Sequence, residues 1–159
     1  MTVDEKDLMI IKMLRRNART SLSEIGKTIG ISDVAVLKRL RKLEKEGVIS
    51  GYTVTLDPKK LGYNSMSMTG VNVQPEHLFK VIEILRKRPE VTYLAVTTGD
   101  HTIMAIIQAR DAEELARIHE EIERYPGVTS VRPAIIVEEI KNNALCLGIP
   151  MADEEETDH

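Results

Sequence analysis

Residues 20–49 have the pattern of two short amphipathic helices that meet at a turn beside Gly30. Ser21 opens an S-x-x-E capping box, which starts a helix by satisfying its first backbone N–H groups. Ser32 is placed to cap the second helix and Gly47 to end it. The residues predicted to face inward are Leu22, Ile25, Ile29, Val36, Leu37, Leu40 and Leu43. Two capped helices joined by so short a turn are typical of a helix-turn-helix.

A third helix is predicted over residues 2–17, directly before this pair. Thr2 and Glu5 have the spacing of a capping box. The apolar stripe of this helix consists of Leu8, Ile10, Ile11 and Leu14. The three helices together would enclose a small core, as in a winged-helix-like DNA-binding domain.

The second helix of the pair carries its positive charges away from its apolar stripe. At about 100° per residue, the side opposite the stripe holds Val34, Lys38, Arg41, Lys42 and Lys45, with Arg39 on the flank. Residues 1–60 contain 13 Lys or Arg against 8 Asp or Glu, and the remainder contains 9 against 17, which gives the whole chain its net charge of −3. Because the basic segment coincides with the helix-turn-helix, we expect binding to double-stranded DNA.

Residues near the start of a recognition helix approach base edges, and those farther along it meet phosphates. We expect base contacts from Asp33, Val34, Ala35 and Lys38. We expect mainly phosphate contacts from Ser21, Lys27, Arg41, Lys42 and Lys45, and Ser32 is a further DNA-binding candidate. Arg39 suits either role, and for each cation a purely solvated surface position remains an alternative.

Composition restricts the class of protein further. With 159 residues, of which 42% are hydrophobic and 30% charged, the chain fits a soluble globular protein of one domain or two small ones. Neither an apolar run near 18 residues nor an apolar leader occurs, so no membrane association is expected. The single cysteine, Cys146, excludes an intramolecular disulfide and favours a cytoplasmic location. Aromatic residues are scarce, which disfavours the base-stacking surfaces of RNA and single-strand binders.

The rest of the chain alternates between strand and helix patterns. A strand is predicted over residues 48–56, and a domain boundary near 57–63. Beyond it, strands are predicted at 64–74, 91–98, 102–109 and 128–140, and helices at 75–89 and 111–125. Gly70 suggests a bulge in the first of these strands. The order βαββαβ predicts an α+β chain whose C-terminal domain is ferredoxin-like, with both helices on one face of an antiparallel sheet.

Residues 102–109 are apolar on both alternating sets. One set is Ile103, Ala105 and Ile107, and the other is Met104 and Ile106. A monomer would expose one set to water, and contiguous apolar surface usually marks an interface. We therefore expect two subunits to pack their sheets together.

Several motifs together resemble the Lrp/AsnC family, the leucine-responsive or feast/famine transcriptional regulators. They are Asp4-Glu5-Lys6-Asp7, the S-x-x-E-I-G run from Ser21 to Gly26, the run from Gly30 to Ile49, Gly51-Tyr52, and Gly99-Asp100 between two strands. The resemblance covers nearly the whole chain. It implies dimers that assemble further, often to octamers, and a small effector, commonly an amino acid, bound between sensor domains.

With an amino-acid effector implied, the turn after residue 96 becomes a candidate site. It groups Thr97, Thr98, Gly99, Asp100, His101 and Thr102. Asp100 suits an ammonium group, while the backbone near Gly99 and the threonine hydroxyls suit a carboxylate. A hairpin in which these residues only satisfy turn geometry remains an alternative. Many family members have Thr on the last strand, where this chain has Pro133 to Ile136, so its pocket is expected to differ.

These interpretations give four segments. They are a helix-turn-helix DNA-binding domain (1–50), a strand and linker (51–63), a βαββαβ effector-binding and oligomerisation domain (64–142), and a C-terminal segment with an acidic tail (143–159). We expect no metal or cofactor, because the four histidines lack metal-binding spacings and His119 suits a core-edge position.

Three alternatives remain open. Some proteins similar to the family are haem-pathway decarboxylases, in which His101 would act as a base, although the cationic helix argues against an enzyme. The chain could also be an effector-independent architectural DNA-binding protein. Finally, the N-terminal domain could dock the transcription machinery rather than DNA.

Overall fold

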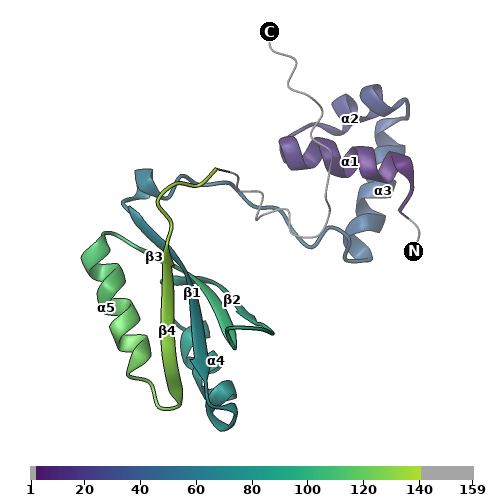
Figure 1. The fold of residues 1–159 in the computed structure, drawn as a ribbon. Coiled ribbons are helices and arrows are strands. Elements are labelled where there is room, and N and C mark those ends of the chain that lie inside the picture. The colour runs from purple at the N-terminus through teal and green to yellow at the C-terminus, as the bar shows by residue number, and fades with distance from the viewer. Residues whose placement is uncertain (1–2, 141–159) are drawn as a thin grey trace. The chain divides into compact units, whose positions relative to one another are not determined.

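A computed structural model of the chain describes residues 3–140 (Figure 1). These residues form two compact units, and the boundary along the chain lies between Thr55 and Leu56. Cys146 and the acidic tail predicted at the C-terminus lie outside the described residues.

The N-terminal unit consists of three helices, α1 (Glu5–Arg16), α2 (Leu22–Ile29) and α3 (Asp33–Lys45). Ser21 and Ser32 cap α2 and α3 as predicted, since each hydroxyl accepts a hydrogen bond of 3.2 Å from the backbone N–H three residues later. The tight turn between these two helices uses Gly30 in the left-handed conformation, at φ 70°.

The predicted start of α1 was wrong. Asp4, not Thr2, caps the helix, because its carboxylate accepts from the N–H of Asp7 while the Asp7 carboxylate accepts from the N–H of Asp4. This reciprocal pair uses two donors that would otherwise be unsatisfied at the helix start. Negative charge in the first turn also complements the helix dipole.

The core of this unit is formed by one apolar side from each helix. Ile10, Ile25, Ile29 and Val36 are buried together, and Leu43 is fully buried farther along α3. Leu8 was predicted to face inward but is 39% exposed, since Ile10 and Ile11 occupy the buried side of α1. The remaining packing follows the predicted stripes.

The strand predicted over residues 48–56 is absent from the described structure. A strand needs a neighbour for its backbone hydrogen bonds, and no described segment pairs with these residues. The Tyr52 hydroxyl instead donates to the Glu44 carboxylate of α3 at 2.7 Å. A short 3₁₀ turn, η1 (Lys59–Leu61), follows before the second unit's sheet.

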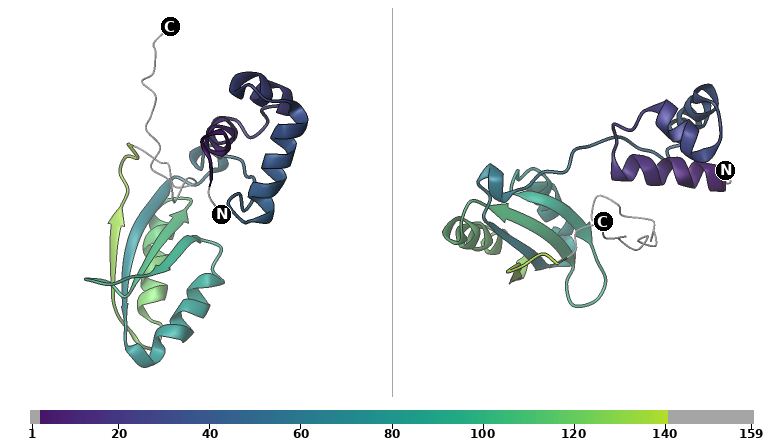
Figure 2. Two further views of the ribbon diagram at one scale, coloured as in Figure 1. Left: turned by 90° about the vertical axis from the view of Figure 1, so that its right-hand side faces the viewer. Right: turned by 90° about the horizontal axis from the view of Figure 1, so that it is seen from above.

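The C-terminal unit is a four-stranded antiparallel sheet in the order β2-β3-β1-β4. Its elements are β1 (Ser65–Val73), η2 (Pro75–His77), α4 (Leu78–Arg86), β2 (Val91–Val96), β3 (Ile103–Ala109), α5 (Ala112–Glu123) and β4 (Val128–Ile135). Figures 1 and 2 show this arrangement, and the predicted βαββαβ order is confirmed. The last strand ends five residues before the predicted limit.

Both helices pack on one face of the sheet. Val81 and Leu85 of α4 join Ile118 and Ile122 of α5 over Ile103, Ala105, Ile107 and Val71 of the central strands. Asp111 caps α5 by accepting a 2.8 Å hydrogen bond from the N–H of Glu114, as predicted. One alternating set of β3 is therefore core.

A small polar cluster lies within this apolar layer. His119 of α5 is 9% exposed, and its Nε2 atom lies 3.0 Å from the Ser67 hydroxyl and 3.1 Å from the Thr69 hydroxyl of β1. The predicted core-edge position of His119 is thus confirmed. Burial lowers the pKa of the imidazole, because charging it inside the protein is unfavourable.

The opposite face of the sheet has no helix over it within the described chain. We call it the open face. Alternation and cross-strand register assign to it Met66, Met68, Gly70, Tyr93, Ala95, Met104, Ile106, Arg132 and Ala134. Met68 is 47% exposed and Tyr93 44%.

No helix among residues 3–140 combines the length and apolar character needed to cross a membrane.

Candidate DNA-binding helix and effector loop

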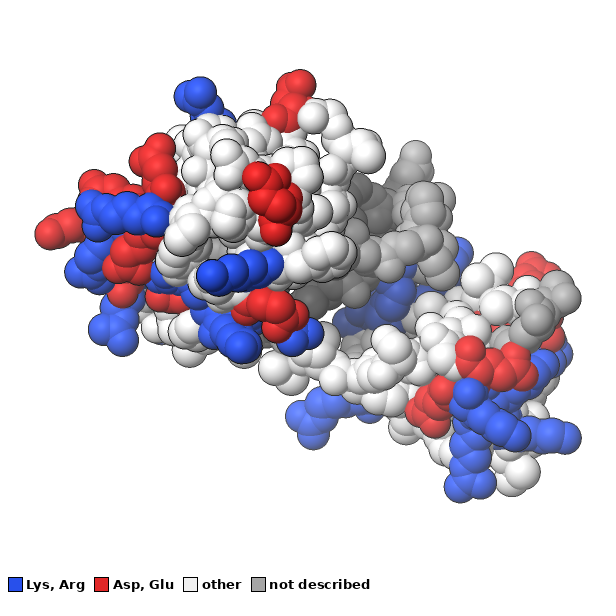
Figure 3. Space-filling model, turned by 90° about the horizontal axis from the view of Figure 1, so that it is seen from below, with Lys and Arg blue, Asp and Glu red and all other residues white. Residues whose placement is uncertain are grey.

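The predicted recognition helix presents its polar side to solvent. Lys38, Arg41, Lys42 and Lys45 of α3 are exposed, as is Lys27 of α2. At the start of α3, Asp33 is exposed, Ala35 is half-buried and Val34 is 76% exposed. Figure 3 shows several Lys and Arg side chains close together on the N-terminal unit, with Asp and Glu side chains beside them. The exposed side of α3 therefore carries the positive charge that a groove contact requires.

Arg39 has different contacts from the other cations of α3. Its Nη1 atom lies 2.6 Å from Asp4 Oδ2 and 2.8 Å from Asp7 Oδ1 at the start of α1. The backbone hydrogen bond from Asp7 and the Arg39 guanidinium together hold the pKa of Asp4 below its usual value. The sequence prediction placed Arg39 on the flank of the helix but missed both partners, which lie more than 30 residues away.

Ser21 and Ser32, the two serines predicted to contact DNA, also cap helices. The hydroxyls of Ser21 and Ser32 accept the capping hydrogen bonds of α2 and α3. Each hydroxyl keeps its own proton as a donor, so capping is compatible with donation to a phosphate oxygen.

Residues 97–102 connect β2 to β3, and we call them the effector loop after the role predicted for them from the sequence. The Thr97 hydroxyl donates to the carbonyl of His101 at 2.7 Å, and the Thr97 N–H donates to the carbonyl of Thr102 at 3.0 Å. Gly99 has φ 104°, a conformation that strongly favours glycine. Thr98 and Asp100 are exposed at the tip. The loop thus exposes a hydroxyl and a carboxylate to solvent.

Gly70 does not form a bulge, contrary to the prediction. Its register is continuous with Met104 on one side and Arg132 on the other, and the irregularity lies between Asn72 and Val73. The glycine instead allows a close approach, because a Cβ atom at this position would overlap the imidazole ring of His101. The Nδ1 atom of this ring is buried without a hydrogen-bonding partner in the described chain.

Asn72 ties the effector loop to the sheet, a role that the sequence did not reveal. Its Oδ1 atom accepts from the N–H of Thr102 at 3.0 Å, and its Nδ2 atom donates to the Ser130 hydroxyl at 3.1 Å. One side chain of β1 therefore connects the end of the loop with β4.

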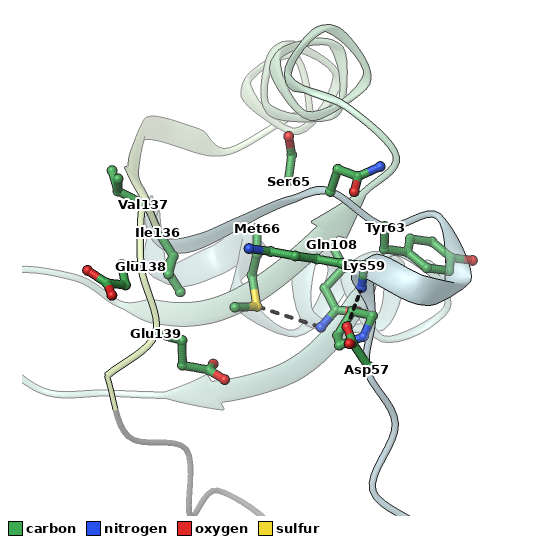
Figure 4. A pocket seen from close by; sticks show the side chains of 12 residues that line it. Asp57, Lys59, Tyr63, Ser65, Met66, Gln108, Ile136, Val137, Glu138 and Glu139 are labelled. Atoms are coloured by element: carbon green, nitrogen blue, oxygen red, sulfur yellow. Dashed lines mark hydrogen bonds between the residues drawn. The ribbon is translucent and has the colours of Figure 1, made fainter.

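A separate pocket of about 300 Å³ lies at the other end of the sheet. Met66, at the start of β1, and Gln108, near the end of β3, form part of its wall, and Gln108 Nε2 lies 3.6 Å from Met66 Sδ (Figure 4). The rest of the lining is Asp57, Pro58, Lys59, Tyr63, Asn64, Ser65, Ile136, Val137, Glu138 and Glu139. None of the predicted effector residues belongs to it. Within the described residues, no group of three or more His, Cys, Asp or Glu side chains is placed to hold a metal ion.

The fold and these surfaces define a two-domain regulator with a helix-turn-helix. Two family models agree with this division. Residues 3–50 match the winged helix-turn-helix DNA-binding model, and residues 67–145 match the Lrp/AsnC ligand binding domain. The chain belongs to the Lrp/AsnC family of transcriptional regulators.

Individual relatives support the assignment. The transcriptional regulator LrpA of Pyrococcus horikoshii is 49% identical over 140 residues, which span 87% of this chain and 99% of the relative. The structure of Escherichia coli AsnC has a TM-score of 0.84 at 25% identity and covers 89% of this chain and 97% of its own. A Neisseria meningitidis transcriptional regulator, solved as a complex with L-Met, shares the fold with a TM-score of 0.84 at 22% identity, over 89% and 94% of the two chains.

The names of the relatives argue against one of the alternatives left open by the sequence, the haem-pathway decarboxylase. They are named as transcriptional regulators with a helix-turn-helix. The protein is a DNA-binding regulator of transcription and not an enzyme, so the decarboxylase alternative is not retained.

Proposed function

We propose that α3 reads the major groove of duplex DNA in a sequence-specific manner. The side chains at the start of α3 would approach base edges, namely Asp33, Val34, Ala35 and Lys38. The phosphates would be contacted by the hydroxyls of Ser21 and Ser32 and by the cations Lys27, Arg41, Lys42 and Lys45. The observation that carries this proposal is the exposed, cationic side of a helix capped at Ser32. Because the proposed target is DNA, we also propose a cytoplasmic location, in a cell whose DNA lies in the cytoplasm.

The proposed working unit is a homodimer formed through the open face, which associates further, as far as an octamer. Met68, Tyr93 and Ile106 would then leave water, which is favourable for apolar side chains. Pairing would hold two recognition helices at a fixed separation and favour a roughly palindromic operator. The proposed division of labour follows the segments given above, with residues 1–50 for DNA and 64–142 for assembly and sensing.

The proposed effector is an amino acid bound at the effector loop, with Asp100 accepting from its ammonium group. The hydroxyl of Thr98 and the backbone near Gly99 would donate to its carboxylate. The L-Met carried by the Neisseria regulator supports an amino acid as the class of ligand. Since the Thr97 hydroxyl is engaged with His101, Thr98 and Asp100 are the side chains best placed to contribute.

Fluorescence anisotropy tests this scheme in a single titration series. The full chain is added to a duplex from its own promoter and to a scrambled duplex, with and without each of the twenty amino acids. We expect tighter binding to the promoter duplex and a change in affinity with at least one amino acid, which is absent in Asp100→Ala. Equal binding to both duplexes would contradict sequence-specific recognition, and a response retained in Asp100→Ala would contradict the placement of the effector.

A further inference from the structure

The side chain of His101 belongs to two surfaces at once. It is part of the effector loop, yet its imidazole lies against Gly70 in the central strand β1. Thr69 points toward α5, where it contacts His119, so the adjacent Gly70 faces the opposite side of the sheet. His101 therefore covers the middle of the open face.

Hydrogen bonds on both sides of His101 determine where its ring lies. The residue's own carbonyl accepts from the Thr97 hydroxyl, and the N–H of Thr102 donates to Asn72 of β1. The first bond lies within the loop and the second connects the loop to β1, so a shift of the loop that breaks the second bond would move the ring relative to Gly70.

The observed ring position is also one that a small change could displace. Its Nδ1 atom is buried without a hydrogen-bonding partner in the described chain, and such a nitrogen costs free energy. Gly70 itself is not among the glycines with positive φ, so its missing side chain serves the ring and not the backbone. The contact between His101 and Gly70 thus depends on the absence of a side chain at position 70 and leaves one ring nitrogen without a hydrogen bond in the described chain.

We propose that His101 is the positioning residue through which an amino acid at the effector loop changes the pairing of two copies of this chain. The proposal rests on the function proposed above. Asp100, the expected ammonium acceptor, directly precedes His101, so its engagement shifts the loop and the ring. Met68 and Met104 flank Gly70 on the open face, so a displaced ring alters the centre of the surface that the second copy contacts.

Sedimentation equilibrium of the full chain with each of the twenty amino acids at millimolar concentration tests the proposal. We expect at least one amino acid to change the dimer dissociation constant of the unmodified chain by about fivefold or more. The same amino acid should change the dimer dissociation constant of His101→Ala by less than about twofold. His77→Ala is the matched control, because His77 also packs on a glycine, Gly127, but lies outside the effector loop. It should respond like the unmodified chain.

Calorimetry and a second pair of variants separate positioning from other roles. His101→Ala should still bind the amino acid, with a dissociation constant within about threefold of the original, because the proposed ligand contacts come from Thr98, the backbone near Gly99 and Asp100, while the His101 ring lies against Gly70. Gly70→Ala should weaken pairing because its methyl group displaces the ring. The double variant Gly70→Ala/His101→Ala should recover pairing but not the response, because the methyl then occupies the place of the ring.

The outcomes distinguish this inference from the function on which it rests. If the unmodified chain responds and His101→Ala responds equally, the inference is wrong and the proposed effector stands. If His101→Ala loses the amino acid altogether, His101 is a binding residue and not a positioning residue. If no amino acid changes the dimer dissociation constant of the unmodified chain, the proposed effector function is wrong, and this inference is wrong with it.

Discussion

The Nη1 atom of Arg39 lies 2.8 Å from Oδ1 of Asp7, whose side chain is only 4% exposed, so an ion pair joins the middle of α3 to the first turn of α1. A buried carboxylate without a cation is costly, and Asp4 adds a second carboxylate at 2.6 Å from the same nitrogen. The flank of the recognition helix is thereby attached to the rest of the unit.

Arg39→Ala should lower the free energy of unfolding by about 1–3 kcal/mol, because Asp7 would keep its burial and lose its partner. Urea denaturation followed by circular dichroism measures this. Arg41→Ala, at an exposed position of the same helix, should change it by less than about 0.5 kcal/mol. In DNA titrations at several salt concentrations, we expect Arg41→Ala to reduce the slope of log K by about 0.9 and Arg39→Ala to leave it unchanged. A reduced slope in Arg39→Ala would show that this cation meets a phosphate after all.

Lys38→Ala should alter which base is preferred at one position of the operator, by about 1–3 kcal/mol of discrimination. Lys42→Ala should instead weaken binding to every duplex equally, because a phosphate contact carries no sequence information. Binding to a library of operators with single base changes distinguishes the two. A uniform loss in both variants would contradict this division of tasks.

Arg88 should contribute more to the stability of the C-terminal unit than an exposed cation does. It is 15% exposed and contacts Glu90 at 3.2 Å, Glu121 at 2.8 Å and the Tyr125 hydroxyl at 2.7 Å, so it connects the start of β2 with the end of α5. We expect Arg88→Ala to destabilise this unit by about 2–4 kcal/mol in thermal unfolding.

Arg86→Ala is the control for this change. Arg86 is 67% exposed and pairs with Glu83, three residues earlier on α4. An exposed pair of this kind contributes about 0.5 kcal/mol or less. Equal losses in the two variants would mean that burial of Arg88 adds nothing.

His119 should make the protein less stable in mild acid. Burial lowers its pKa in the folded state, so the unfolded chain binds the proton more readily, and stability is lost as the pH falls through the unfolded pKa of about 6.5. The loss levels off below the folded pKa. In His119→Gln, whose amide can still bond to Ser67 or Thr69, unfolding free energies between about pH 7.5 and 5.5 should vary less. An unchanged slope would assign the acid sensitivity to another group.

Met68→Asp should prevent pairing through the open face. Met68 lies opposite Ile106 and Ala134, and a carboxylate there would be desolvated by a second sheet. Light scattering should report the mass of a single chain. Phe79→Asp is the matched control, because Phe79 is 82% exposed on α4, on the other side of the sheet. Monomers produced by Phe79→Asp but not by Met68→Asp would place the interface on the helices.

Most helices and strands could be predicted because their apolar periodicity decides which side is buried. The failures have local physical reasons. Residues 48–56 have strand composition but no pairing partner in the described chain, and strand formation depends on that partner. At the start of α1, the spacing of Thr2 and Glu5 matched a capping box, but the helix begins instead at the reciprocal hydrogen bonds of Asp4 and Asp7.

The sites were less predictable than the fold, because they depend on residues that are distant in sequence. The effector loop was visible as a cluster of polar residues in a turn. Asn72, which anchors it, and Gly70, which receives His101, come from another strand and carry no local signal of that role. For the same reason, Arg39 could be placed on its helix but not paired with Asp4 and Asp7.

The contact of His119 with Ser67 and Thr69 also restricts how the sheet and this sequence can change. A slip of β1 by one residue would bring Met66 and Met68 under α5 and leave the imidazole without either hydroxyl, so the three side chains select a single alignment of the central strand. A side chain at position 119 that cannot form hydrogen bonds would leave both hydroxyls without this partner, so we expect descendants of this gene to keep a hydrogen-bonding side chain there.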